Sequence, residues 1–302
     1  MNKYLFNNTL IIGIGLIGSS IAIGLRKNKI SNKIFGFDIN KKHIKKSKKL
    51  KIIDKDIKNL SKIKNIDLIV ICSPVGTYDN IFKKILPNIN KKCIVSDVGS
   101  TKLNLINLFE KYNNKNLSNF VPCHPIAGIE KSGPEYGFAE LFKNRYCILT
   151  PTKPRSIATK KISKMWKKLG MKIEIMDAER HDRLLAMISH IPQLIAYSVV
   201  STTKDLEKNL KYDLIKLSAG GFRDFTRLAG SDPIMWRDIY SENKKFVLEM
   251  LSRFSEDLLT LQKAIRNNNL KFLEKTFVET KKIRAKIEKQ GQAGFFDPRE
   301  KK

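Results

Sequence analysis

Residues 9–38, TLIIGIGLIGSSIAIGLRKNKISNKIFGFD, decide the fold of this 302-residue chain. A β-branched run predicts a strand over 9–14, and an amphipathic stretch predicts a helix over 16–27. A second strand is predicted over 33–38, and the pattern G-x-G-x-x-G lies between the first strand and the helix. Strand, glycine turn, helix and strand in this order indicate a dinucleotide-binding α/β fold of the Rossmann type.

Each glycine of the turn has a distinct physical role. Gly13 permits the tight turn, Gly15 lets the backbone approach a pyrophosphate, and Gly18 allows the helix to pack closely on the strand. Asp38, 20 positions after Gly18, is expected to accept hydrogen bonds from a ribose. No arginine for a 2′-phosphate stands beside it, so we expect NAD in preference to NADP. The residues expected to bind the cofactor are Gly13, Gly15, Leu16, Ile17, Gly18, Asp38, Ser73 and Pro74.

Further short apolar runs predict an open parallel sheet, with strands over 67–72, 93–96, 120–121, 146–149 and 173–176. Ligands bind beyond the carboxyl ends of such strands. Polar residues follow three of these ends, namely Ser73, Ser100 and His124. We therefore expect all three to line one crevice, beside the nicotinamide.

His124 lies in PCHPIAGIEKSG, residues 122–133, between two prolines and close to two glycines. A segment so rich in these residues is expected to be a shaped turn that holds the imidazole in place.

From residue 177 onward, long helical periods replace the strand signals, with helices over 178–200, 233–265 and 270–290 and a kink at Pro192. The sequence thus predicts a nucleotide-binding domain over 1–176 and an all-helical domain over 177–302. The helix over 184–200 is too apolar for a solvated face, so we expect a homodimer formed through the helical domain.

The remaining histidines and the arginines divide into site candidates and others. His181 is interpreted as structural and His43 as a plain surface residue, whereas His190 is either a core histidine or a substrate contact. His190 follows His181 by nine residues, which places the two on nearly opposite sides of a straight helix, so no metal site is expected. Arg227 is expected to be desolvated by Phe222 and Phe225 and to bind a carboxylate.

Composition narrows the class of protein. The formal net charge is +29, with 12 arginines and 46 lysines, but the lysines are spread along the whole chain and no nucleic-acid-binding motif is present. The four cysteines have no C-x-x-C pair and are expected to be reduced, mostly buried thiols of a cytoplasmic protein. Residues 4–25 carry no charge, but their glycine spacing favours the nucleotide turn over a membrane span.

Six motifs together resemble the prephenate/arogenate (cyclohexadienyl) dehydrogenase family of tyrosine biosynthesis. They are GIGLIGSS (13–20), CSPV (72–75), DVGSTK (97–102), PCHPIAGIEKSG (122–133), HDRLLAMISHIPQ (181–193) and GGFRDFTRLAGSDPIMWRD (220–238). The resemblance implies a Rossmann domain followed by an all-helical dimerisation domain. It also implies oxidation of the ring carbinol of a cyclohexadienol acid with loss of CO2, the hydride passing to NAD.

The resemblance implies a role for each matching residue. His124 matches the catalytic histidine that accepts the hydroxyl proton, and Ser100 matches the serine that orients this histidine and the nicotinamide. Arg227 matches the arginine that binds a substrate carboxylate. The other pocket positions are Ser189, His190, Gln193, Arg223 and Trp236. Gln193 stands where a number of relatives carry histidine, which leaves the choice between prephenate and arogenate open.

Three other functions stay open from the sequence. The first is another NAD-linked hydroxy-acid dehydrogenase of the same two-domain plan, although such enzymes more often use a lysine base. The second is a basic nucleic-acid-binding protein built on a dinucleotide fold. The third is a non-catalytic NAD sensor, which would not need His124 and Arg227 together.

Overall fold

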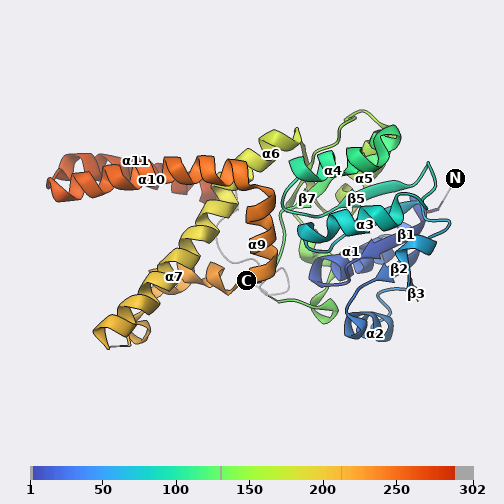
Figure 1. Cartoon of the computed structure of the whole chain (residues 1–302), viewed down its shortest axis with the longest axis horizontal. Helices are drawn as coiled ribbons and strands as arrows, with labels where there is room; N and C mark the ends of the chain where they lie inside the picture. The colour runs from blue at the N-terminus through green and yellow to red at the C-terminus, as the bar shows by residue number, and fades with distance from the viewer. Residues whose placement is uncertain (1–2, 130, 212, 290–302) are drawn as a thin grey trace.

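The computed structural model describes residues 3–129, 131–211 and 213–289 of the chain. Figure 1 shows an N-terminal half built around a sheet, the expected nucleotide-binding half, and a helical half whose long helices extend away from it. The observed architecture confirms the expected fold class, a Rossmann-type α/β domain followed by helices.

The main sheet is parallel throughout and runs in the order β3-β2-β1-β4-β5-β6. Its strands are β1 (Phe6–Ile12), β2 (Ser31–Phe37), β3 (Lys55–Asp56), β4 (Leu68–Ile71), β5 (Ile94–Asp97) and β6 (Phe120–Val121). Successive side chains of β1 enter different cores, because Leu10 and Ile12 pack on one face and Ile11 on the other. Burial on both faces explains the continuous apolar runs in the sequence.

Helices cover both faces of this sheet. They are α1 (Leu16–Lys27), α2 (Lys41–Lys49), α3 (Tyr78–Ile85), α4 (Leu103–Asn113) and α5 (Ile157–Lys168). Trp166 of α5 belongs to the same buried cluster as Ile21 of α1. On the opposite face Phe82 of α3 meets Phe109 of α4 edge to face, and Phe109 stacks on Phe120 with ring centroids 4.0 Å apart. The short 3-10 segments of this half are η1 (Leu60–Lys62), η2 (Val75–Thr77), η3 (Asn114–Asn119), η4 (Pro134–Tyr136) and η5 (Ala139–Phe142).

The expectation of one parallel sheet was wrong for its last part. Strands β8 (Tyr146–Leu149) and β9 (Lys172–Ile175) form a separate sheet with β7 (Cys123–Pro125), in the order β7-β8-β9. The pair β7–β8 is antiparallel. Pro122 has no N–H to extend the pairing of β6 with β5, and its carbonyl instead accepts the N–H of Thr150. His124 therefore lies on a short strand, opposite Ile148, and not in a free turn.

The rest of the described chain is mostly helical, as the sequence predicts, but the single helix expected over 233–265 is broken at Asn243 into two. They are α6 (Ala178–Leu185), α7 (Ile191–Leu210), α8 (Gly220–Thr226), α9 (Pro233–Glu242), α10 (Lys244–Arg266) and α11 (Leu270–Lys289), with 3-10 segments η7 (Ile215–Leu217) and η8 (Arg227–Gly230). Asp177 and Asp232 cap α6 and α9 by accepting backbone N–H groups. In Figure 1, α10 and α11 run side by side away from the sheet, and α7 runs out at an angle to them.

The expected kink at Pro192 takes the form of a π-helical turn, Ala186–His190, between α6 and α7. The N–H of Ile191 donates to the carbonyl of Ala186, five residues back. The wider turn absorbs the loss of the N–H of Pro192 and changes the phase of the helix. The straight-helix comparison of His181 with His190 therefore does not hold.

The helical half has a small core of its own, Ala186, Ile191, Phe246, Val247 and Met250. Large apolar side chains remain exposed on α7, α10 and α11. By length and composition, the continuous helix Ala178–Leu210 is also apolar enough to cross a membrane, and 33% of its most apolar window is buried. The core helices of soluble proteins pass the same test.

Candidate active site

The glycine turn between β1 and α1 has the geometry that its sequence predicts. A Cβ on Gly13, whose φ is 93°, would lie 2.8 Å from the carbonyl of Cys72. A Cβ on Gly18 would lie 2.0 Å from the carbonyl oxygen of Gly13. A Cβ on Gly15 would meet nothing within 4 Å. Two glycines are thus required by the fold itself, and the third leaves open space at the start of α1.

That open space suits a pyrophosphate. Gly15 is the N-cap of α1, and no acidic residue stands in the first turn, which contains Leu16, Ile17 and Gly18. The first N–H groups of a helix lack partners within the helix and carry its positive dipole end. Ser73 and Pro74 follow the neighbouring strand β4, where the hydroxyl of Ser73 bonds that of Thr77 at 2.8 Å.

Asp38 lies at the end of β2 and braces the same turn. Its Oδ2 accepts the N–H of Ile14 at 2.8 Å, and its Oδ1 accepts the N–H of Asn40 at 2.8 Å. Nδ1 of His43 lies 3.2 Å from Oδ2. The interpretation of His43 as a plain surface residue was therefore wrong, because α2 returns it to the nucleotide turn.

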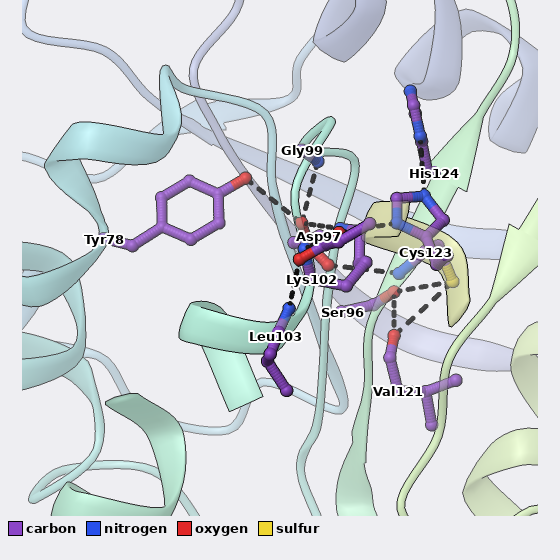
Figure 2. Close-up of polar contacts among 11 residues, drawn as sticks. Tyr78, Ser96, Asp97, Gly99, Lys102, Leu103, Val121, Cys123 and His124 are labelled. Carbon is purple, nitrogen blue, oxygen red and sulfur yellow. Dashed lines mark hydrogen bonds and ion pairs between the residues drawn. The ribbon is translucent and has the colours of Figure 1, made fainter. Parts of the chain in front are cut away.

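Asp97, at the end of β5, is the centre of a buried polar cluster (Figure 2). Its Oδ2 lies 2.5 Å from Nζ of Lys102 and also accepts the N–H of Gly99 and the hydroxyl of Tyr78. Its Oδ1 accepts the N–H of Cys123 at 3.1 Å. Asp97 and Lys102 are both fully buried. The cluster fixes β7, and with it His124, against the carboxyl edge of the main sheet.

His124 is buried, and its Nδ1 lies 2.9 Å from Nε2 of His181. Nδ1 of His181 in turn lies 2.7 Å from Oδ1 of Asp182. The sequence interpretation of His181 as structural missed this contact, because no local pattern in the sequence indicates that α6 packs against β7. Burial lowers the pKa of His124 well below its usual value of 6.5, and His181, Lys102 and His190 add to the effect.

A second buried group lies around His190. Its Nδ1 lies 3.1 Å from Nδ2 of Asn243, and its ring meets that of Trp236 with centroids 5.9 Å apart. Burial lowers the pKa of His190 to about 4. Within the described chain, Nε2 of His190 and Nε1 of Trp236 are buried without a hydrogen-bond partner. Buried polar groups without a hydrogen bond destabilise a fold, and two of them side by side are unusual unless a ligand supplies the missing partner.

The remaining predicted site residues have mixed environments. Gln193 is buried and donates from Nε2 to the carbonyl of Leu228 at 2.6 Å, which ties α7 to η8. Ser189 and Ser100 are half-buried, and the hydroxyl of Ser100 makes no hydrogen bond to the described residues. Arg223 and Arg227 are exposed. The expected desolvation of Arg227 was therefore wrong for the single chain, because this residue of η8 is exposed.

No group of three or more His, Cys, Asp or Glu side chains suited to a metal ion is found in residues 3–129, 131–211 and 213–289. The four cysteines are free, and Cys93, Cys123 and Cys147 are buried.

Two family models match the chain. The nucleotide-binding domain of prephenate dehydrogenase matches residues 21–175, and the dimerization domain of prephenate dehydrogenase matches residues 177–279. The cyclohexadienyl dehydrogenase of Zymomonas mobilis is 36% identical, over 92% of this chain and 95% of that protein. The prephenate dehydrogenase of Lactococcus lactis is 32% identical, over 95% of this chain and 80% of that protein.

Two similar solved structures are a prephenate and an arogenate dehydrogenase. The prephenate dehydrogenase of Aquifex aeolicus, solved with hydroxyphenyl propionate and NAD+, is 37% identical with a TM-score of 0.88. The alignment covers 93% of this chain and 98% of that one. The arogenate dehydrogenase of Synechocystis is 25% identical with a TM-score of 0.76, and the alignment covers 92% of this chain and 99% of that one.

Proposed function

Because this chain belongs to the prephenate dehydrogenase family, we propose that it converts prephenate to 4-hydroxyphenylpyruvate by oxidative decarboxylation, with His124 as the base. The chain is an NAD-dependent dehydrogenase. The hydroxyl proton of the substrate passes to Nε2 of His124, the hydride leaves the ring carbinol carbon, and the carboxylate of the ring leaves as CO2. The ring becomes aromatic, which drives the reaction without a metal.

NAD supplies the hydride acceptor when it is bound. The open start of α1 at Gly15, Leu16 and Ile17 would hold its pyrophosphate, and Ser73 and Pro74 would border it at the end of β4. Asp38 still has acceptor capacity on Oδ1 for a ribose hydroxyl. A carboxylate at this position repels a 2′-phosphate, which supports NAD over NADP.

The observation that carries the proposal is the place of His124, a buried imidazole on β7 at the carboxyl edge of the main sheet. A neutral imidazole is a competent base near pH 7, and burial keeps His124 neutral by lowering its pKa. The position of β7 at the carboxyl edge of the sheet supports its contact with the nicotinamide side of the site. Ser100, three residues after β5, would help to orient this histidine and the nicotinamide, as the resemblance implies.

The substrate pocket is proposed on the helical side of His124. Nε2 of His190 and Nε1 of Trp236 are buried nitrogens without a protein partner, which suits contact with substrate oxygens. Arg227 would bind a carboxylate, with Arg223 adding positive charge. Gln193 and Ser189 would border the substrate side chain. The amide of Gln193 is neutral and can both donate and accept, so it is compatible with the keto group of prephenate and with the amino group of arogenate.

A homodimer formed through residues 177–302 is part of this proposal, with the domain boundary after residue 176. The exposed apolar side chains of α7, α10 and α11 support it, as does the match of residues 177–279 to the dimerization domain of prephenate dehydrogenase. A cytoplasmic location is proposed from the four free thiols.

An assay of NADH and NADPH production tests the proposal directly. Prephenate and arogenate are each supplied with NAD and with NADP to the purified protein. We expect turnover with prephenate and NAD. Turnover confined to arogenate would reassign the substrate, and no turnover with either substrate would overturn the proposed function.

A further inference from the structure

A line of three buried side chains runs from the nucleotide-binding half into the helical half. His124 comes from β7, whereas His181 and Asp182 come from α6. The two contacts, His124 Nδ1 to His181 Nε2 and His181 Nδ1 to Asp182 Oδ1, measure 2.9 and 2.7 Å. His181 and Asp182 are almost completely buried, so water does not compete for these bonds.

The direction of the hydrogen bonds is set at the Asp182 end. Oδ1 of Asp182 accepts the backbone N–H of Lys102 at 2.8 Å, and Oδ2 accepts that of Leu103 at 2.8 Å. Backbone N–H groups can only donate, so both oxygens act as acceptors there. Burial raises the pKa of Asp182, whereas the N–H groups of Leu103 and Lys102 and the charge of Lys102 favour its carboxylate form. Because both oxygens already accept hydrogen bonds, we take the N–H on Nδ1 of His181 to point toward Oδ1.

The direction of the hydrogen bond between His181 and Asp182 determines the direction of the one between His124 and His181. Burial lowers the pKa of both His124 and His181, with Lys102 and His190 opposing their protonation further, so both rings are neutral near pH 7. A neutral ring that carries its proton on Nδ1 has a bare Nε2. His181 therefore offers Nε2 as an acceptor, and His124 must donate from Nδ1.

We propose that His181 and Asp182 are positioning residues that hold His124 in the tautomer protonated on Nδ1, which leaves Nε2 as the proton acceptor of the reaction. The inference rests on the proposed role of His124 as the base. Resemblance to the family assigns the orientation of this histidine to Ser100, yet in the structure the hydrogen-bond partner of its Nδ1 is Nε2 of His181. Since Asp182 is itself held by the start of α4, the base is assembled only where the two halves of the chain meet.

The tautomer can be measured directly. The chain has four histidines, so a ¹⁵N-histidine-labelled sample gives a simple spectrum of ring nitrogens. Spectra of His124→Asn and His181→Gln assign the two rings. We expect His124 near pH 7.5 to show a protonated Nδ1 and a bare Nε2. A protonated Nε2 on His124, as a neutral Asp182 would produce, overturns the inference.

Two substitutions of His181 test the consequence for turnover. His181→Gln keeps a donor for Asp182 and an acceptor for His124, whereas His181→Leu removes both. We expect His181→Leu to lower kcat about 10²–10⁴-fold, with little change in NAD affinity and substrate KM. We expect His181→Gln to recover most of that loss. Equal losses in the two variants would contradict a positioning role.

The outcomes separate this inference from the proposed function. If His124→Asn keeps its turnover, the role of His124 as the base is wrong. If His124→Asn is inactive but His181→Leu keeps its kcat and the tautomer of His124, only the positioning role is wrong. Should His181→Leu fail to fold, the tautomer of the unmodified protein still decides the question.

Discussion

In the nucleotide-binding half, the main sheet is covered on both faces and its side chains fill two large buried clusters. In the helical half, the one small cluster found in the described residues has five members. Large apolar side chains there remain at the surface, with exposed fractions of 62% for Leu259, 67% for Ile265 and 56% for Phe277. The nucleotide-binding half, here called the closed half, buries its own core. The helical half, here called the open half, leaves apolar surface for another molecule to cover.

The difference in packing corresponds to a difference in function. The groups of the closed half, namely the glycine turn, Asp38 and His124, are held by contacts within one chain. Those proposed to bind substrate, above all Arg223 and Arg227, lie on the open half and are exposed in the single chain. Substitutions in the two halves should therefore affect different steps, and the following predictions test this division.

The largest effect is expected from His124→Asn. The variant keeps a polar side chain on β7 but removes the base, so kcat should fall about 10²–10⁴-fold. NAD binding, measured by fluorescence titration, should be retained because the glycine turn is untouched. A variant that loses NAD affinity at unchanged kcat would place His124 outside the chemistry.

The next largest effect tests the open half. Phe277→Asp removes an apolar side chain that we expect a partner subunit to cover, once on each side of a symmetric interface. At about 1.5 kcal/mol per copy the dimer should weaken by about 3 kcal/mol, or ~10²-fold. Sedimentation velocity measures the change in mass. Lys281→Asn alters the charge of α11 by the same amount and should leave the mass unchanged; equal behaviour of the two variants would argue against this interface.

Arg227→Ala should change substrate binding more than cofactor binding. A charged hydrogen bond to a carboxylate contributes about 1.5–3 kcal/mol, so substrate KM should rise about 10–100-fold while the KM for NAD stays near its normal value. Arg155→Ala, which removes an exposed arginine from the nucleotide-binding half, is the matched control. Steady-state kinetics with both substrates varied measures both constants. An unchanged substrate KM in Arg227→Ala would refute carboxylate binding.

Gly18 and Gly15 provide a matched pair within the closed half. A methyl group on Gly18 would approach the carbonyl oxygen of Gly13 to 2.0 Å, so Gly18→Ala should destabilise the fold by about 1–3 kcal/mol. A methyl group on Gly15 meets no protein atom within 4 Å. Gly15→Ala should therefore keep its melting temperature but bind NAD about tenfold more weakly. Calorimetry and NAD titration on both variants separate the two roles, and equal melting temperatures would contradict the packing role of Gly18.

The closed half was also the more predictable of the two. The helix over 16–27 and the strand ends were readable because their hydrophobic periods and glycines act locally. The second sheet was missed because the pairing of β7 with β8 joins residues more than 20 positions apart and depends on Pro122. No periodicity in the sequence reports such a pairing.

The site was predictable residue by residue but not as a network. Sequence singled out His124 from its prolines and glycines, yet it gave His181 a structural role. The contact between these two rings depends on how α6 docks against β7, and the π-helical turn after α6 has no signal beyond Pro192. Likewise, His43 returns to Asp38 only because α2 follows β2 closely in space.

The smallest expected effect is on the pH dependence of kcat/KM. It tests how far the open half changes the pKa of His124 in the closed half. Besides burial, the groups that lower the pKa of His124 are Lys102 from the nucleotide-binding half and His181 and His190 from the helical half. A base works only when deprotonated, so kcat/KM should stay level as pH falls through 6.5 and decline about tenfold per unit only below the lowered pKa. The profile is measured at constant ionic strength, because the net charge of +29 makes the encounter with an acidic substrate depend on salt. A decline that begins at or above pH 6.5 would mean that the helical half does not enclose His124 in solution.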